Sequence, residues 1–193
     1  MTSSNQTALI VIDVQESFRD LDFWGPSANP AAEANIAALI ADWREHDRGP
    51  VVLVRHDEPV PGSPLHPAHP QNRLQPFLDA VNPELLITKS VNSAFYGEPD
   101  LHRWLQDGGI SELVLCGIQT NMCVETTARM AGNLGYGVQL PLDATRTFDL
   151  VGTVPGLGEV GLSASELMVA TALNLHLGEF AQVTTTAAVL QRA

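Results

Sequence analysis

The sequence is poor in cysteine and in basic residues. It holds two Cys in 193 residues, too few for the disulfide framework that stabilises many small secreted proteins. Ten Lys and Arg stand against 22 Asp and Glu, which gives a net charge of −12. Such an acidic chain is disfavoured as a ligand of nucleic acid or of an anionic membrane surface. We therefore expect neither as a partner.

Long apolar runs are also missing. No stretch approaches the roughly 20 apolar residues that a membrane-spanning helix needs. The opening segment, MTSSNQTALIVIDVQ, has neither the basic start nor the small-residue cleavage site of a secretory signal peptide. These absences favour a cytoplasmic protein. Because domains typically have about 100–200 residues, we expect a single domain over residues 1–193.

What the chain does contain is an alternation of short apolar segments with longer amphipathic ones. The segments rich in Val, Ile and Leu predict strands at 7–13, 50–55, 84–89, 112–117, 137–142 and 180–185. Apolar residues at helical spacing predict helices at 31–46, 99–109, 124–135 and 163–176, with a short one at the C-terminus. Such an alternation predicts an α/β fold, in which helices cover both faces of a parallel sheet. The connections 56–83 and 143–162 are long enough to suggest functional loops.

Three reactive side chains fall at the ends of predicted strands. Asp13 ends the first strand, Lys89 ends the third, and Cys123 follows the fourth through a turn that opens a helix. Each has an ordinary explanation when taken alone: a turn former, a solvated lysine, or a small buried apolar residue. Ligands of open α/β sheets bind outside the carboxyl ends of the strands. The coincidence of all three at this edge therefore favours a shared site.

The chemistry of these three groups is complementary. A helix N-terminus and a nearby cation such as Lys89 both lower the pKa of a thiol, so we expect the pKa of Cys123 to be lowered. Asp13 can act as a base toward the thiol and as an acid toward a leaving amine. Backbone N–H groups of the turn can stabilise an oxyanion. The pattern predicts that Cys123 is a nucleophile.

Four segments together resemble the isochorismatase-like cysteine hydrolases, a superfamily that includes nicotinamidase and N-carbamoylsarcosine amidohydrolase. In chain order they are IVIDVQ, ITKSVNSAF, CGIQTNMCVETTARMAGNLGY and LPLDATRTF, within residues 8–150. The resemblance implies a catalytic triad of Asp13, Lys89 and Cys123. It also implies a doubly wound, mostly parallel sheet of six strands, and cleavage of a C–N bond in a small-molecule amide, cyclic amide or ureide through a thioester.

The resemblance implies a particular geometry in the turn before the nucleophile. Family members have a non-proline cis peptide there, which maps onto the bond between Ile118 and Gln119 in this sequence. It would direct the N–H of Gln119, together with that of Cys123, toward the oxyanion. Family members are commonly dimers or larger, so a homodimer or a larger homo-oligomer is expected.

Nicotinamidases of this superfamily carry an Asp-x-His pair and a later His that bind a metal. The segment RHDEPVPGSPLHPAHP has no such pair, although His56, Asp57, His66 and His69 could ligate zinc by composition. We expect no metal and no other cofactor. The segments VRHDEPVPGSPLH and KSVNSAFYG resemble instead a metal-free subgroup of amide and cyclic-amide hydrolases, near the streptothricin hydrolases.

Side chains in the loops beside the strand ends are candidate contacts for the substrate. They are Phe18, Trp24, His56, Asn92, Phe95, Tyr96 and Gln119. The aromatic rings would either wall a pocket or pack the loops onto the domain. Asn92 and Gln119 would hydrogen-bond a carbonyl or amide of the substrate. His56 would read a polar tail of the substrate, or it is a loop histidine with structural partners.

Two other functions stay open. One is hydrolysis of a vinyl ether, as in the isochorismatases proper, which generally lack the nucleophilic Cys. The other is a non-enzymatic module that binds a small molecule or senses oxidants through Cys123. The presence of Cys123 favours C–N hydrolysis over the first. Turnover of an amide would separate it from the second.

Overall fold

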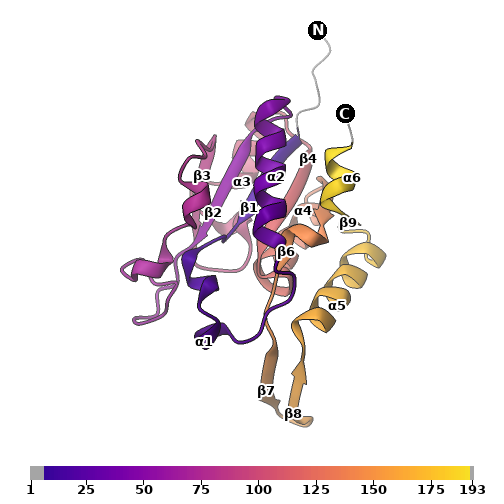
Figure 1. The fold of residues 1–193 in the computed structure, drawn as a ribbon. Helices are drawn as coiled ribbons and strands as arrows, with labels where there is room; N and C mark the ends of the chain where they lie inside the picture. Colours follow the sequence, from indigo (N-terminus) through magenta and orange to yellow (C-terminus); the bar gives the residue numbers. More distant parts are fainter. Residues whose placement is uncertain (1–6, 192–193) are drawn as a thin grey trace.

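A computed structural model describes residues 7–191, and its centre is a parallel sheet (Figure 1). The strands of this sheet are β1 (Thr7–Ile12), β2 (Val51–His56), β3 (Leu85–Lys89), β4 (Glu112–Ile118), β5 (Gly137–Pro141), β6 (Thr145–Arg146) and β9 (Gln182–Thr184). Their order is β3-β2-β1-β4-β5-β9, with β6 beside the end of β4. The predicted α/β architecture is confirmed. The expected count of six strands is wrong, because β6 adds a seventh.

Helices cover both faces of the sheet. The covering helices are α2 (Ala32–Glu45), α3 (Leu101–Asp107), α4 (Glu125–Asn133), α5 (Ala164–Leu177) and α6 (Thr186–Leu190), whereas the short α1 (Leu21–Trp24) has no buried residue. Side chains of α2 and α6 share one core cluster, and those of α3, α4 and α5 share another on the opposite face. Within residues 7–191, none of the helices has the length and apolar character needed to cross a bilayer.

The apolar strands follow from this double covering. Along β1, Leu9 and Val11 face the cluster of α2, whereas Ile10 and Ile12 face the cluster of α3 and α4. Because helices bury both faces, the strand is apolar at successive positions instead of alternating with polar residues. The carboxyl ends of β1, β2, β3 and β4 lie at the same edge, since these strands pair in parallel.

The connection 143–162 contains a structure that the sequence analysis did not predict. It forms an antiparallel hairpin of β7 (Leu150–Val154) and β8 (Gly158–Leu162). Pro155 and Gly156, the latter at φ 88°, lie in the turn between the strands. Figure 1 shows the hairpin extending away from the sheet and its helices. We call residues 150–162 the arm.

Candidate active site

The ammonium group of Lys89 is the centre of a buried polar cluster at the carboxyl edge of the sheet. Its Nζ lies 2.6 Å from Oδ2 of Asp13, 3.0 Å from Nδ1 of His56 and 3.2 Å from Sγ of Cys123. An ammonium has three N–H donors, and these three atoms can accept all of them. Asp13, Lys89 and Cys123 are buried. The structure thus brings together the three residues that the strand ends singled out.

The register of the strands places these groups. His56 and Lys89 are direct partners on the parallel strands β2 and β3, so their side chains stand next to each other on the same face. Asp13 follows β1 with φ 52°, in the left-handed region that Asp tolerates better than most residues. Its backbone N–H donates to the carbonyl of Val54 at 2.9 Å, which keeps it beside β2.

The last residues of β4, just before the turn that leads to Cys123, lie very close to β1. A Cβ on Gly117, which has φ 127°, would lie 2.0 Å from the carbonyl oxygen of Ile12, so only glycine fits. The peptide bond between Ile118 and Gln119 is cis, as the resemblance implies. Residues Thr120–Val124 then form one π-helical turn, and α4 continues from Glu125. Cys123 therefore lies just before the α-helix, at the end of this turn.

Two amide side chains fix the backbone of His56. Oε1 of Gln15 accepts from the His56 N–H at 2.8 Å, and Nε2 of Gln15 donates to the His56 carbonyl at 3.0 Å. Asn72 donates to the same carbonyl at 2.9 Å. Gln15 and Asn72 are both buried. Neither residue was predicted from the sequence, although Gln15 is a polar residue two positions after Asp13, at the end of an apolar strand.

Burial dominates the protonation of the cluster. It raises the pKa of the Cys123 thiol to about 12, with a further contribution from Asp13, and Lys89 offsets only part of this rise. The expectation of a lowered thiol pKa is therefore wrong. Burial also raises the pKa of Asp13 against the opposing effect of Lys89. Burial and the Lys89 charge lower the pKa of His56, so its imidazole is neutral at pH 7 and Nδ1 can accept from Lys89.

A thiol with this pKa should react slowly with alkylating agents at neutral pH. Only the thiolate is nucleophilic, and its fraction rises tenfold per pH unit below a pKa of about 12. We expect the rate at which iodoacetamide alkylates Cys123 to climb steadily from about pH 6 to pH 9 without levelling off. Peptide mass spectrometry distinguishes this site from Cys116, the other cysteine. A plateau below about pH 8 would show instead that the thiolate is present at rest.

The predicted substrate contacts after β3 differ in how exposed they are. Oδ1 of Asn92 lies 3.9 Å from Sγ of Cys123, and Tyr96 is largely exposed. Phe95 is 7% exposed and stacks on Tyr136, and it shares a core cluster with Cys123. Its contact with substrate stays a prediction.

The aromatic residues after β1, Phe18 and Trp24, pack beside Ile118, the residue that begins the turn to Cys123. Phe18 is 3% exposed and lies in a cluster with Phe148 and Ile118, against which Trp24 packs. Phe18 therefore packs its loop onto the domain, the second of the two roles considered for the aromatic rings. Trp24 is partly buried, and its Nε1 donates to the carbonyl of Ser17 at 2.9 Å. Gln119 is partly exposed in the turn before Cys123.

The four residues considered for zinc do not gather into one site. Asp57 is paired with Arg55 at 2.8 Å, while His66 and His69 each accept an N–H from a residue two positions on. Within residues 7–191, the grouping with metal-ligand side chains is Asp13, His56 and Cys123. The Lys89 ammonium is hydrogen-bonded to all three, so a metal cation would have to displace it.

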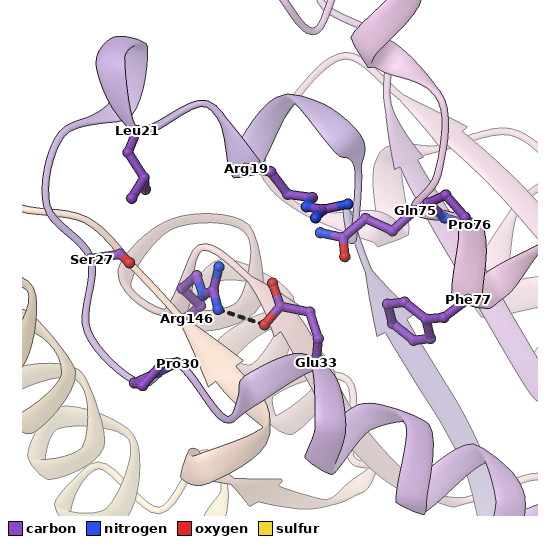
Figure 2. A pocket seen from close by; sticks show the side chains of 9 residues that line it. All are labelled: Arg19, Leu21, Ser27, Pro30, Glu33, Gln75, Pro76, Phe77 and Arg146. Carbon is purple, nitrogen blue, oxygen red and sulfur yellow. Dashed lines mark hydrogen bonds and ion pairs between the residues drawn. The ribbon is translucent and has the colours of Figure 1, made fainter.

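A cavity of about 580 Å³ is lined by residues outside this cluster (Figure 2). Arg146 and Glu33, which form an ion pair at 2.6 Å, both line it. Its other lining residues are Arg19, Leu21, Ser27, Pro30, Gln75, Pro76 and Phe77. None of Asp13, Lys89 or Cys123 lines it, so the candidate chemistry belongs to the Lys89 cluster.

Comparison with known proteins identifies the family. Residues 7–187 match the isochorismatase domain. The chain belongs to the isochorismatase family. This member is 38% identical over 143 residues to YrdC of Bacillus subtilis, an uncharacterised isochorismatase family protein, with 74% of this chain and 75% of that one covered. It is also 29% identical to the streptothricin hydrolase of Streptomyces noursei, with 95% of this chain and 63% of that protein covered.

Solved structures agree with this assignment. A putative hydrolase of the isochorismatase family from Chromobacterium violaceum superposes with a TM-score of 0.86 at 36% identity, covering 97% of this chain and 93% of that one. This isochorismatase family member is therefore a hydrolase with the family's α/β fold.

Proposed function

We propose that this hydrolase cleaves a C–N bond of a small-molecule amide, cyclic amide or ureide through a thioester on Cys123. The observation that carries the proposal is the single buried ammonium of Lys89, which is hydrogen-bonded to both the Asp13 carboxylate and the Cys123 sulfur. A thiol, a carboxylate base and a cation in mutual contact are the parts that nucleophilic amide hydrolysis requires. Similarity to a streptothricin hydrolase supports a hydrolase of this kind.

In the first half-reaction, Asp13 accepts the proton of the Cys123 thiol as sulfur attacks the carbonyl carbon. The raised pKa of Asp13 makes its carboxylate a stronger base, which compensates in part for the high pKa of the thiol. The ammonium of Lys89, in contact with both groups, stabilises the negative charge as it moves from the Asp13 carboxylate to the Cys123 sulfur. The C–N bond then breaks, Asp13 returns the proton to the leaving nitrogen, and a thioester remains on Cys123.

In the second half-reaction, water attacks the thioester carbonyl and Asp13 accepts a proton from it. The C–S bond breaks, the acid leaves and the proton returns to sulfur. The N–H groups of Gln119 and Cys123 are the proposed donors to the oxyanion in both steps. His56, which holds Lys89 through Nδ1, can donate from Nε2 to a polar group of the substrate. Asn92, whose Oδ1 lies 3.9 Å from the Cys123 sulfur, and the exposed Tyr96 are further proposed contacts.

Intact-mass spectrometry with a panel of small amides, ureides and lactams tests the proposal. We expect an acyl adduct on the wild-type chain, located on the peptide that contains Cys123, together with release of ammonia or amine. The Cys116→Ala variant is the matched control, since it removes the other cysteine, which is buried in β4. It should form the same adduct. Turnover of an amide with no adduct, even on rapid quenching, would argue for direct attack by water.

A further inference from the structure

The cavity of about 580 Å³ in Figure 2 has the size of a small-molecule site, since such sites commonly measure about 300–1,000 Å³. Its lining comes from four parts of the chain: the segment 19–30, the first turn of α2, the segment 75–77 and strand β6. Two Arg and one Glu give this lining a charge of +1, although the whole chain carries −12. The cavity can therefore hold a negatively charged group on an otherwise acidic protein.

The hydrogen-bond donors of the cavity are the guanidinium groups of Arg146 and Arg19. Arginine has five N–H donors, and Arg146 donates to Glu33 from Nη2. Its Nε is buried and has no hydrogen-bond partner within residues 7–191. Glu33 lies in the first turn of α2, where the helix dipole already favours a negative charge. Arg146 therefore keeps donors for a second anion, and Arg19, whose side chain is 61% exposed, adds a second guanidinium.

The hydrogen-bond acceptors of the cavity are Gln75 and Glu33. Gln75 is 4% exposed, and its Nε2 donates to the carbonyl of Gln15 at 3.3 Å. Because a carbonyl can only accept, this bond fixes the orientation of the amide. Oε1 of Gln75 then has no donor among residues 7–191, and Figure 2 shows the side chain directed across the cavity. Leaving a buried acceptor without a partner costs free energy, so a donor on a ligand would stabilise this amide.

Apolar side chains border the same cavity. Leu21 and Phe77, which are 52% and 36% exposed, lie on opposite sides of it (Figure 2). Pro30 and Pro76 are also part of the lining. An apolar group bound between them would remove these surfaces from water, which is favourable. The cavity thus offers donors, acceptors and an apolar wall to one ligand.

We propose that this cavity binds a free α-amino acid with an apolar side chain. The carboxylate of the amino acid accepts from Arg19 and Arg146, and its ammonium donates to Oε1 of Gln75 and to Glu33. These two charged groups are attached to one carbon of the ligand. The opposite charges of Arg146 and Glu33 are also adjacent, 2.6 Å apart. The apolar side chain of the ligand packs on the ring of Phe77.

Isothermal titration calorimetry with L-phenylalanine tests this site on the wild-type chain. We expect a dissociation constant below about 1 mM. Two analogues each lack one of the charged groups: 3-phenylpropanoate has no ammonium, and 2-phenylethylamine has no carboxylate. Each should bind at least about tenfold more weakly than L-phenylalanine, because it leaves the donors or the acceptors of the cavity without a partner.

Substitutions of exposed side chains locate the binding. Arg19→Met and Phe77→Ala should each raise the dissociation constant of L-phenylalanine about tenfold, with an unchanged circular dichroism spectrum. Arg103→Met is the matched control. Arg103 is exposed on α3 and pairs with Asp107 four positions on, much as Arg19 pairs with Glu16 three positions back. This variant should bind L-phenylalanine as tightly as wild type.

Three results would overturn the proposal. The first is the absence of binding at about 10 mM L-phenylalanine. The second is binding of either analogue as tight as that of L-phenylalanine, which would leave the donors or the acceptors without a role. The third is an unchanged dissociation constant in Arg19→Met or Phe77→Ala, which would place the ligand elsewhere. None of these measurements depends on turnover, so the result is independent of the proposed amidase activity.

Discussion

Replacing Cys123 with Ala is expected to lower amide turnover by at least about 10⁴-fold, since loss of a nucleophile removes the covalent route altogether. The thiol is hydrogen-bonded to Lys89 and buried beside Asp13, and no other cysteine can replace it. Cys116 has its side chain in the core cluster of α2. Ammonia release by wild type and Cys123→Ala, measured on the same substrate, checks the prediction.

The controls separate the three candidate functions. Cys116→Ala should retain turnover within a few-fold of wild type. Full amide turnover by Cys123→Ala would contradict the thioester route. Release of pyruvate from isochorismate that is insensitive to Cys123→Ala would favour vinyl-ether hydrolysis instead. A thiol that reacts with peroxide, with no turnover of any amide in the panel, would favour the non-enzymatic reading.

Replacing Lys89 with Met is expected to destabilise the fold by about 3–5 kcal/mol, because it leaves the Asp13 carboxylate buried without its cation. Lys89 and Asp13 are both buried, with Nζ and Oδ2 2.6 Å apart. Urea unfolding of wild type and variant at the same pH measures the difference. The double variant Asp13→Asn with Lys89→Met removes both charges and should recover most of the loss.

The loss of stability in Lys89→Met should also depend on pH. The pKa of Asp13 is already raised above its ordinary value in the folded protein, and without Lys89 it rises further. A carboxyl whose pKa is higher when folded binds its proton more tightly in the folded state. It therefore favours folding at low pH, and this contribution is lost as pH rises through the folded pKa. The difference in free energy of unfolding between wild type and Lys89→Met should therefore be smaller at about pH 5 than at about pH 8. A deficit that does not change with pH would show that Asp13 is not the unpaired charge.

The sequence was sufficient to predict that the three reactive side chains lie at one edge of the sheet. Parallel strands share a carboxyl edge, so Asp13 and Lys89 could be placed together from their strand ends alone, and Cys123 from the turn after β4. The pKa of the thiol could not be inferred this way. It depends on how deeply the fold buries sulfur and on how closely Asp13 approaches it, and neither is a property of local sequence.

The rest of the cluster depends on contacts between distant segments. His56 meets Lys89 because of the register of β2 on β3, and Gln15 reaches His56 across 41 positions of sequence. Aromatic residues such as Phe18 and Phe95 are common both in pockets and in cores. Tertiary packing decides which of the two a given ring faces. The arm was missed because its glycines and Pro155 are typical of a loop.

The position of the two cysteines limits how the protein can recover from oxidation. Cys116 belongs to the core cluster of α2, whereas Cys123 belongs to the cluster of α3 and α4 on the other face of the sheet. A sulfenic acid formed on Cys123 would need a nearby thiol to condense into a disulfide, and β4 itself separates it from Cys116. A disulfide on the way back to the thiol must therefore form with a thiol of another molecule.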